Sequence, residues 1–348
     1  MGKERKKRTT IRDIADAVGI APSSVSKALN DLPTISANMK TLVRAKALEL
    51  NYKHNSHAAN LRRGSSRTIG VIVPKINVAF FADVISGIEQ TCFENDHGLI
   101  ICQSEESYIK EAKAVETLIQ QNVDCILISL SQETKSIEHL KEVSNHHIHL
   151  IQFDRVDESL GGHMLVNDNH EASCKAVNHL ISQGYKSIAF LGGPDNLPLY
   201  KERKQGFLDS IKKAGLVIPY NFIVDNILKK ETAQTTALEL LKLNTPPDAF
   251  FTVSDYAALG VLKAAELCQK NVPEDIGIIG FSNEFFTEVM SPTLSTVGQQ
   301  SKKMGQEAAN IYFDHILNKD GFNKESPFFK KVIESSIIIR QSSSKMMN

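Results

Sequence analysis

Short apolar runs alternate with amphipathic stretches along most of this chain. From Thr68 onward, apolar runs occupy 69–74, 99–104, 123–130 and 148–154, with helix-like stretches near 82–96, 108–121 and 133–145 between them. Short strands separated by helices form parallel sheets with crossover connections. The pattern therefore predicts an α/β fold built on a doubly wound sheet.

The same alternation then starts again. Apolar runs at 164–168, 187–193, 222–226, 249–255 and 276–282 enclose helix-like stretches at 169–183, 199–214, 231–243 and 256–269. LSTVGQQ, a helix near 299–318 and a strand-like VIESSIIIRQS follow. We therefore expect two successive α/β halves within 68–343: an N-subdomain of about 68–160 and 297–325, and a C-subdomain of about 161–296 and 326–343.

The stretch from Thr10 to Asn30 has a different character. It reads as two short helices joined by a tight turn. Thr10 can cap the first helix with Asp13 as its capping-box partner, and Gly19 suits the left-handed end of that helix. Pro22 suits the first turn of the second helix. This pattern indicates a helix-turn-helix, with a small core formed by Ile14, Val18, Val25 and Leu29.

A third helix follows, capped by Ser36 and running to about Leu50. Its inner side is predicted to carry Leu42, Val43, Ala47 and Leu48. Residues 1–53 are thus predicted to form a helix-turn-helix DNA-binding domain. Residues 54–67 are polar and basic, and are predicted to form a short hinge helix and a linker, which would order only against a partner.

The charge distribution supports this division. Residues 1–67 contain 14 Lys+Arg against 5 Asp+Glu, whereas the whole chain has 40 of each. A basic end on an acidic body suggests nucleic-acid binding confined to that end. The five cysteines are scattered without a CxxC pair, so free thiols are expected rather than a metal site or disulfides. No signal peptide or membrane span is recognisable, which predicts a cytoplasmic protein.

Several motifs, in order, resemble the lactose-repressor (LacI/GalR) family of bacterial transcriptional regulators. They are TIRDIADAVGIAPSSVSKALN, ELNYKHNSHAANLRRG, FDRV, HLISQGYKSIAFLGGP, RKQGF, SDYAALGVL, VPEDIGIIGFSN and SPTLSTV. The resemblance implies a homodimer that binds a pseudo-palindromic operator and acts as a transcriptional repressor. It also implies an effector-binding core of the periplasmic-binding-protein type.

The resemblance extends to individual DNA-binding positions. Pro22, Ser23 and Lys27 match positions that read base edges, although the family usually has Arg where Lys27 stands. Hydroxyl and amide groups suited to phosphate contacts are Thr10, Ser24, Ser26 and Asn30. Leu61 matches the hinge leucine that wedges into the minor groove, and Ala58 is small enough to let the hinge lie close to it. Two alternatives stay open: Pro22 serves only to start its helix, and the hydroxyls serve only as caps or solvated groups.

Effector-binding candidates follow the predicted strands, since ligands of such folds bind at the carboxyl ends of strands. Asn77, Phe80 and Phe81 follow the first strand, Arg155 follows the fourth, and Asp168 follows the fifth. Arg203 and Asp255 match family residues that hold the effector. Ser282 stands where the family often has Asp, so the resemblance implies a sugar or sugar derivative as effector without pointing to one sugar. Core packing of one Phe and helix capping by Asp168 with Glu171 are the competing interpretations.

Two other classes of function are less well supported. A sugar-binding module without DNA function would not need the helix-turn-helix. An enzyme would need a catalytic motif, and the sequence contains no P-loop, no GxSxG and no GxGxxG after a strand. We therefore expect no catalytic residues and no cofactor.

Overall fold

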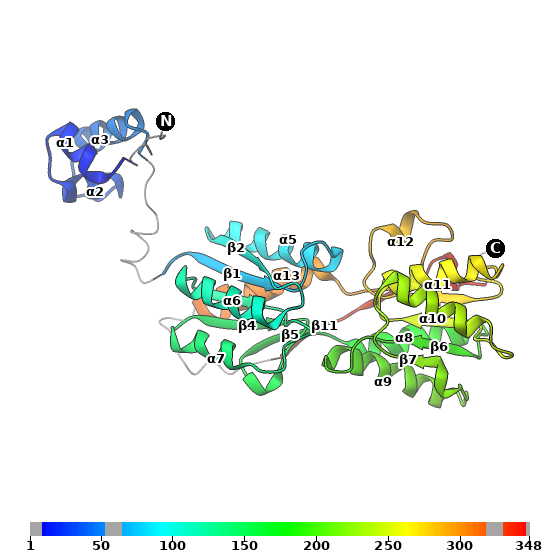
Figure 1. Cartoon of the computed structure of the whole chain (residues 1–348). Helices are drawn as coiled ribbons and strands as arrows, with labels where there is room; N and C mark the ends of the chain where they lie inside the picture. The colour runs from blue at the N-terminus through cyan, green and yellow to red at the C-terminus, as the bar shows by residue number, and fades with distance from the viewer. Residues whose placement is uncertain (1–8, 53–64, 318–329, 346–348) are drawn as a thin grey trace, which may run out of the picture. The chain divides into compact units, whose positions relative to one another are not determined.

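The computed structural model describes residues 9–52, 65–317 and 330–345. The chain divides into two compact units, Met1–Ser65 and Ser66–Asn348 (Figure 1). The predicted hinge residues Ala58 and Leu61 lie outside the described residues.

The described part of the first unit contains three helices: α1 (Ile11–Val18), α2 (Pro22–Leu29) and α3 (Ala37–Glu49). The backbone N and Oγ1 of Thr10 each lie 2.7 Å from Oδ2 of Asp13, which confirms the capping box. Gly19 ends α1 in a left-handed conformation with φ 75°. These local signals place the turn of the helix-turn-helix.

The core of this unit differs from the prediction at two leucines of α3. Ile14, Val25 and Val43 are fully buried, and Ala47 is nearly so. Leu42 and Leu48, predicted to face inward, are 50% and 80% exposed. Since Val43 and Ala47 stand four residues apart on one helical stripe, they cover the facing helices and leave the flanking leucines outside.

The second unit begins with a six-stranded, all-parallel sheet in the order β11–β5–β4–β3–β1–β2. Its strands are β1 (Thr68–Val73), β2 (Gly98–Gln103), β3 (Cys125–Ile128), β4 (His149–Phe153), β5 (His163–Asn167) and β11 (Lys330–Ile333). The helices around it are α5 (Ala79–Glu94), α6 (Tyr108–Gln120), α7 (Glu138–Asn145) and α13 (Ser301–Asn310), the last continued by a π-helical turn at Ile311–Leu317. These elements form the first subdomain.

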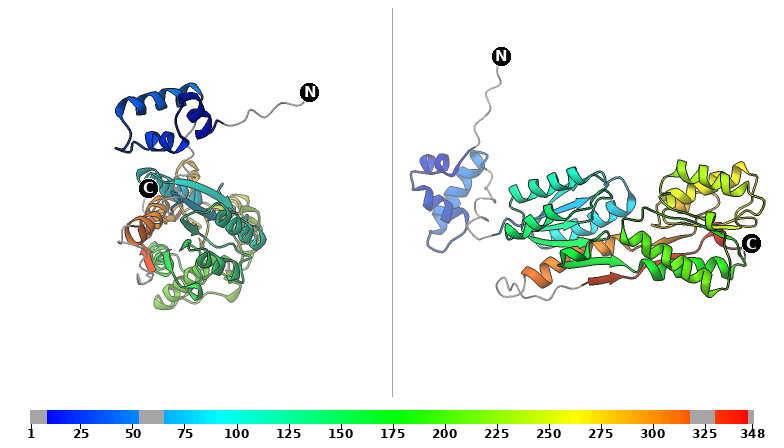
Figure 2. Two further views of the ribbon diagram at one scale, coloured as in Figure 1. Left: turned by 90° about the vertical axis from the view of Figure 1, so that its left-hand side faces the viewer. Right: turned by 60° about the horizontal axis from the view of Figure 1, so that its bottom comes forward.

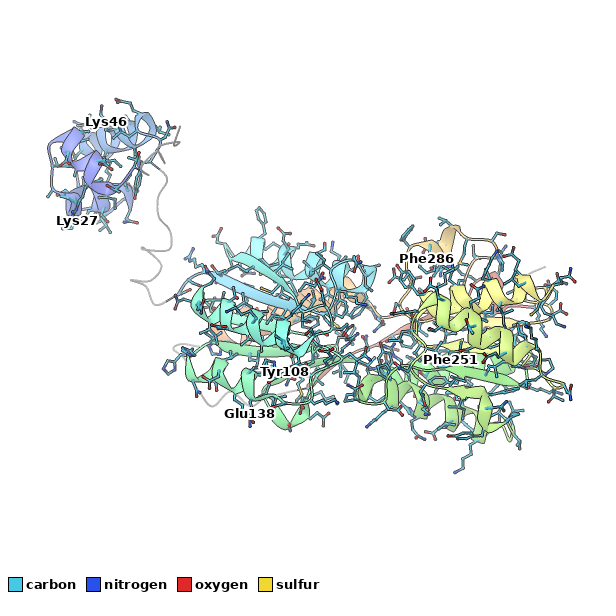
Figure 3. All side chains as sticks on the ribbon, in the orientation of Figure 1. Lys27, Lys46, Tyr108, Glu138, Phe251 and Phe286 are labelled. Carbon is cyan, nitrogen blue, oxygen red and sulfur yellow. The ribbon has the colours of Figure 1, made fainter. Side chains whose placement is uncertain are left out.

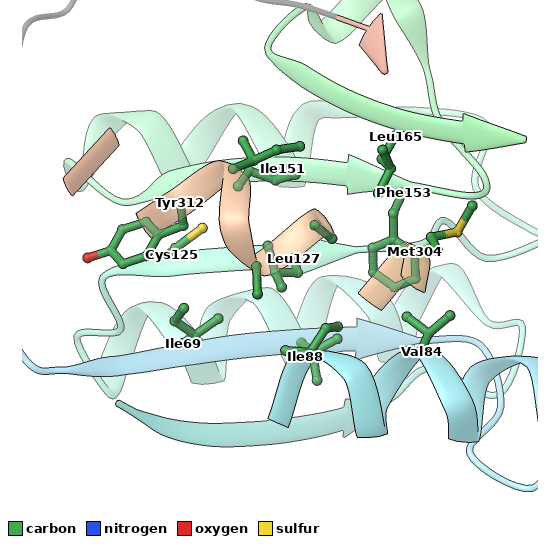
Figure 4. Close-up of a cluster of buried hydrophobic side chains, with 14 of the residues drawn as sticks. Ile69, Val84, Ile88, Cys125, Leu127, Ile151, Phe153, Leu165, Met304 and Tyr312 are labelled. Atoms are coloured by element: carbon green, nitrogen blue, oxygen red, sulfur yellow. The ribbon is translucent and has the colours of Figure 1, made fainter. Parts of the chain in front are cut away.

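One core of this subdomain lies between the sheet and the helices α5 and α13 (Figure 4). Strand residues such as Ile69, Leu127 and Phe153 meet Val84 and Met304 from the helices. A second apolar cluster covers the other face under α6 and α7. Because both faces are covered, the strands read as continuous apolar runs.

The second subdomain holds a four-stranded parallel sheet in the order β7–β6–β8–β9. Figure 2 shows this subdomain, in green to yellow, beside the first one. Its strands are β6 (Ile188–Leu191), β7 (Ile223–Val224), β8 (Ala249–Thr252) and β9 (Gly277–Ile279). Its helices are α8 (Asn169–Ser182), α9 (Pro198–Lys213), α10 (Lys230–Leu241), α11 (Asp255–Leu267) and the short α12 (Phe286–Val289). None of the described helices could span a membrane.

The boundary between the subdomains differs from the prediction. Both β5 and β11 belong to the first sheet, whereas we expected residues 161–296 and 326–343 in the C-subdomain. The chain therefore passes between the subdomains after Asn167 and after Ile333. The other passage follows β10 (Thr296–Gly298), which pairs in antiparallel fashion with β12 (Ser336–Ile338), and leads into α13. An apolar run in the sequence predicts a buried strand, but it does not show which strands lie next to it in the sheet.

Candidate functional site

A cleft of about 580 Å³ draws its walls from both subdomains. It brings together seven of the eight predicted effector-binding residues: Asn77, Phe80, Phe81, Arg155, Arg203, Asp255 and Ser282. The first four come from the first subdomain and the last three from the second. Such a cleft can hold a small molecule in contact with both lobes.

Several of these residues meet in the cleft because they directly follow the ends of strands. Arg155 lies just beyond β4, and Ser282 lies just beyond β9. Asp255 opens α11 shortly after β8 ends. Since all strands of a parallel sheet point the same way, their carboxyl ends deliver these side chains to one edge.

Arg155 is a buried cation with acidic partners. Its Nη1 donates to Glu106 Oε2 at 2.6 Å, and its Nε lies 3.9 Å from Asp154 Oδ2. Burial opposes its charged form, but Tyr200, Glu106 and Asp154 raise its pKa above the ordinary value. The guanidinium also lies 5.8 Å from the ring centre of Phe81. Arg155 is therefore held in place and compensated within the protein.

Arg203 is equally buried, and Asp154 and Glu202 favour its charged form without forming an ion pair with it. It is 3% exposed, and its Nε and Nη1 donate to Asn169 Oδ1 at 2.9 Å and to the Val253 carbonyl at 3.2 Å. Its guanidinium lies 3.6 Å from the ring centre of Phe281. Burial lowers the pKa of Arg203 to about 10. Both acceptors are neutral, and among the described residues no carboxylate forms an ion pair with it.

Asp255 is a buried acid that the second subdomain contributes to the cleft. It accepts hydrogen bonds from Thr296 Oγ1 at 2.6 Å and from the Glu284 backbone amide at 2.7 Å. Burial raises its pKa to about 6, and burial together with Asp255 raises the pKa of Glu284 to about 7. These two acids therefore change charge near neutral pH.

Ser282 links the cleft to the passages between the subdomains. Its Oγ donates to Gln299 Oε1 at 3.2 Å, and Gln299 Nε2 donates to Asn167 Oδ1 at 3.2 Å. Asn167 Nδ2 in turn lies 3.0 Å from the Gln299 carbonyl and 3.2 Å from the Ile333 carbonyl. Asn167 thus ties together the three segments that cross between the subdomains.

Asp168 lies among these crossing segments and is not part of the cleft wall. Its Oδ1 accepts from the Ser335 backbone amide at 2.7 Å, and Oδ2 lies 3.8 Å from Lys175 Nζ. It precedes α8 without making a side-chain cap. The helix-cap interpretation of Asp168 is therefore wrong, and its side chain connects the passage after Asn167 with the passage after Ile333. Its contact with the effector stays a prediction.

Several cleft residues escaped the prediction. Gln299 follows the strand-like LSTVG, so the strand-end rule itself would have found it. Glu284 lies two residues beyond Ser282. Lys229 and Lys230 stand at the start of α10, where no side chain caps the helix. Glu106 lies shortly beyond β2, so the strand-end rule would also have found it, and it bonds Arg155 in the cleft.

On the helix-turn-helix, the structure places the candidate base-reading residues on an open face. Pro22, Ser23 and Lys27 are exposed on α2, opposite the buried Val25 and Ala28 (Figure 3). Ser24 and Ser26 are half-buried on the same helix. Thr10 and Asn30 are exposed at helix ends, where Thr10 also serves as a cap and Asn30 Nδ2 donates to the Ser26 carbonyl.

One further group of possible metal ligands lies on α8. His170, Glu171 and Cys174 offer donor atoms within 4.8 Å of one another. His170 Nε2 already bonds Asp209 at 2.8 Å, and Cys174 bonds the Gly206 carbonyl at 3.4 Å. All five cysteines are free thiols.

Comparison with known proteins decides the family. Residues 10–55 match the bacterial regulatory proteins of the lacI family, and residues 177–343 match the periplasmic binding protein-like domain. The chain thus combines a lacI-family DNA-binding domain with a periplasmic-binding-protein-like domain. It is accordingly a DNA-binding transcription regulator and not an enzyme.

The similarity spans the whole length of known regulators. The transcriptional repressor PurR of Vibrio parahaemolyticus is 29% identical over 97% of this chain and 99% of its own. The lac repressor dimer solved with operator and the anti-inducer ONPF has a TM-score of 0.83 at 18% identity, covering 97% of this chain and 100% of its own. The regulator CelR, solved with cellobiose, has a TM-score of 0.71 at 23% identity, covering 96% and 100%.

Proposed function

We propose that this lacI-family protein is a repressor that binds a pseudo-palindromic operator as a homodimer and is switched by a sugar or sugar derivative in the cleft. The observation that carries this proposal is the cleft itself: residues from both subdomains, selected from the sequence as ligand contacts, line one cavity. The lac repressor dimer bound to operator and CelR bound to cellobiose support the two halves of the proposal by analogy.

For the DNA end, one helix-turn-helix presents few base contacts. Lys27 and Ser23 stand one turn apart on the exposed face of α2 and supply the main hydrogen-bond donors there. Lysine can donate to guanine O6 and N7 but lacks the planar fork of arginine. Two copies on two-fold related half-sites would double the contacts.

For the effector end, the cleft offers both aromatic and polar groups. Phe80 and Phe81 are each 5% exposed and belong to the core as well as to the cleft wall. Their small exposed surface could lie against an apolar face of a sugar ring. Arg155, Arg203, Asp255 and Ser282 supply donors and acceptors for hydroxyl groups.

Selection from a random duplex library tests the DNA-binding half. We expect the full-length protein to enrich a consensus with two-fold symmetry, and a DNA fragment carrying it to be retarded in a gel. A library that stays random after selection would contradict the proposal. A thermal-shift screen of sugars with the same protein tests the effector half, since a ligand that binds only the folded state raises the melting temperature.

A further inference from the structure

Three side chains on the first two turns of α8 place metal-binding atoms close together. His170, Glu171 and Cys174 offer an imidazole nitrogen, a carboxylate oxygen and a thiol sulfur, all within 4.8 Å of one another. His170 and Cys174 stand four residues apart, so they lie on the same face of the helix. None of the three lines the cleft between the subdomains, so this group is separate from the proposed effector site.

Asp209 on α9 fixes the ring of His170. His170 Nε2 lies 2.8 Å from Asp209 Oδ2, and Gln205 Nε2 donates to the other carboxylate oxygen at 2.8 Å. These hydrogen bonds lower the pKa of Asp209, so it is a carboxylate at neutral pH. Because a carboxylate can only accept, Nε2 of the neutral ring carries the hydrogen and Nδ1 keeps its lone pair. Metal-binding histidines are held in this way, by a carboxylate on their other nitrogen.

The Nδ1 atom of His170 lies toward the thiol of Cys174. The nitrogen and the sulfur are 3.8 Å apart. A tetrahedral Zn²⁺ bound about 2.1 Å from a nitrogen and about 2.3 Å from a sulfur holds these two atoms about 3.6 Å apart. The observed spacing therefore needs little adjustment. Glu171 is exposed, so its side chain can turn to supply a third ligand and leave the fourth position to water.

A contact between two helices explains only part of this arrangement. The pair of His170 and Asp209 would join α8 to α9 without a cysteine beside it. Cys174 is half-buried, and its sulfur lies 3.4 Å from the Gly206 carbonyl oxygen, which keeps the thiol next to the imidazole ring. Sulfur and imidazole ligands favour Zn²⁺ over Mg²⁺ and Ca²⁺, which prefer oxygen ligands.

We propose that His170, Glu171 and Cys174 bind one Zn²⁺ or a similar thiophilic divalent cation, with Asp209 as a positioning residue. Binding replaces the thiol hydrogen of Cys174 by the metal and releases one proton to water. This inference goes beyond the proposed function and does not depend on it, since the site lies outside the cleft. The spacing of the cysteines did not indicate such a site, because only one of its ligands is a cysteine.

A cobalt titration of the full-length protein, reduced and freed of metal by dialysis against a chelator, tests the site. Co²⁺ accepts the same tetrahedral geometry as Zn²⁺, and a cobalt–thiolate bond gives an intense absorption band in the near ultraviolet. We expect this band to saturate at one Co²⁺ per chain and to disappear when Zn²⁺ is added. In a background of excess Mg²⁺, Zn²⁺ should also raise the melting temperature.

Variants separate this site from the other thiols. Cys174→Ser should abolish the cobalt band, whereas Cys268→Ser, which changes another half-buried free thiol, should leave it unchanged. Asp209→Asn keeps all three ligands and should weaken the affinity for Zn²⁺ by about 10–100-fold. The inference is overturned by a wild type that gives no band, by a band of full intensity in Cys174→Ser, or by an unchanged Zn²⁺ affinity in Asp209→Asn.

Discussion

At the scale of single residues, Asp255 shows how burial sets a charge. Its pKa rises from 3.8 to about 6 in the folded protein because the cleft wall removes it from water. Between these two values the folded state holds a proton that the unfolded chain has released. The stability contributed by Asp255 is therefore greatest at low pH and falls as the pH rises toward and through 6.

Asp255→Asn should consequently flatten the pH dependence of folding. Relative to this variant, the wild type should lose roughly 1 kcal/mol of unfolding free energy between pH 5 and pH 7.5. The lost charge also removes one cause of the raised pKa of Glu284, which acts in the same direction. Urea unfolding at both pH values measures the difference, with the exposed Asp96→Asn as a control. Parallel profiles for wild type and Asp255→Asn would contradict the prediction.

Leu61 carries a second residue-scale prediction, made from the sequence. It is an apolar residue in a polar, basic segment, and an apolar wedge that unstacks a base step acts only where the duplex is bent to receive it. Leu61→Ala should weaken binding to the selected operator by at least about tenfold while leaving binding to random duplex nearly unchanged. Gel retardation on both DNAs measures this, and an equal loss on the two would remove the wedge role.

At the scale of elements, α5 and α13 pack more closely than ordinary side chains allow. A Cβ on Gly87 would lie 2.1 Å from the Lys302 carbonyl oxygen, and one on Gly305 would lie 2.0 Å from the Val84 carbonyl oxygen. Backbone atoms cannot move aside as a flexible side chain can. The two glycines therefore set the distance between helices that belong to distant parts of the sequence.

Gly87→Ala should separate this pair of helices. Alanine favours a helix by about 1 kcal/mol over glycine, but the clash should outweigh this gain and destabilise the protein by about 1–3 kcal/mol. The midpoint of urea unfolding measures the net effect. Ser86→Ala, on the exposed side of the same helix, should leave the midpoint unchanged or slightly higher. A Gly87→Ala protein as stable as the wild type would show that α13 can shift at little cost.

Helices and strands could be predicted from the sequence more reliably than the elements that lie beside them. Thr10, Gly19 and Pro22 signal their roles locally, so the ends of α1 and α2 follow from a few residues. The strand 163–167 was also recognisable, but its place beside β4 depends on where the chain crosses between lobes. The seven cleft residues follow from the strand-end rule and the resemblance. Lys229 and Lys230 do not, because exposed lysines at a helix start look the same in a cleft and on a free surface.

At the scale of the whole molecule, the three crossing segments are the only covalent path between the described lobes. Asn167, 3% exposed, hydrogen-bonds to both other segments, and Gln299 connects it to Ser282 in the cleft. A ligand that displaces the Ser282 hydroxyl would disturb the same network that fixes the lobes. This provides a physical route from effector to lobe orientation, without fixing whether the effector releases or strengthens DNA binding.

Coupling between the two ends must be reciprocal if the proposed switch operates. An effector found by thermal shift should change the affinity for operator DNA by about 5–150-fold. Operator DNA should change the affinity for that effector by the same factor. Titration of each ligand with and without the other measures both factors. Asn167→Ala should reduce both factors, because it removes the hydrogen bonds of Asn167 to the other two crossing segments. The affinity for the effector in the absence of DNA should change less than these factors do. An effector affinity unaffected by operator in the wild type would rule out the switch. Coupling that persists in full in Asn167→Ala would show that the signal travels by another path.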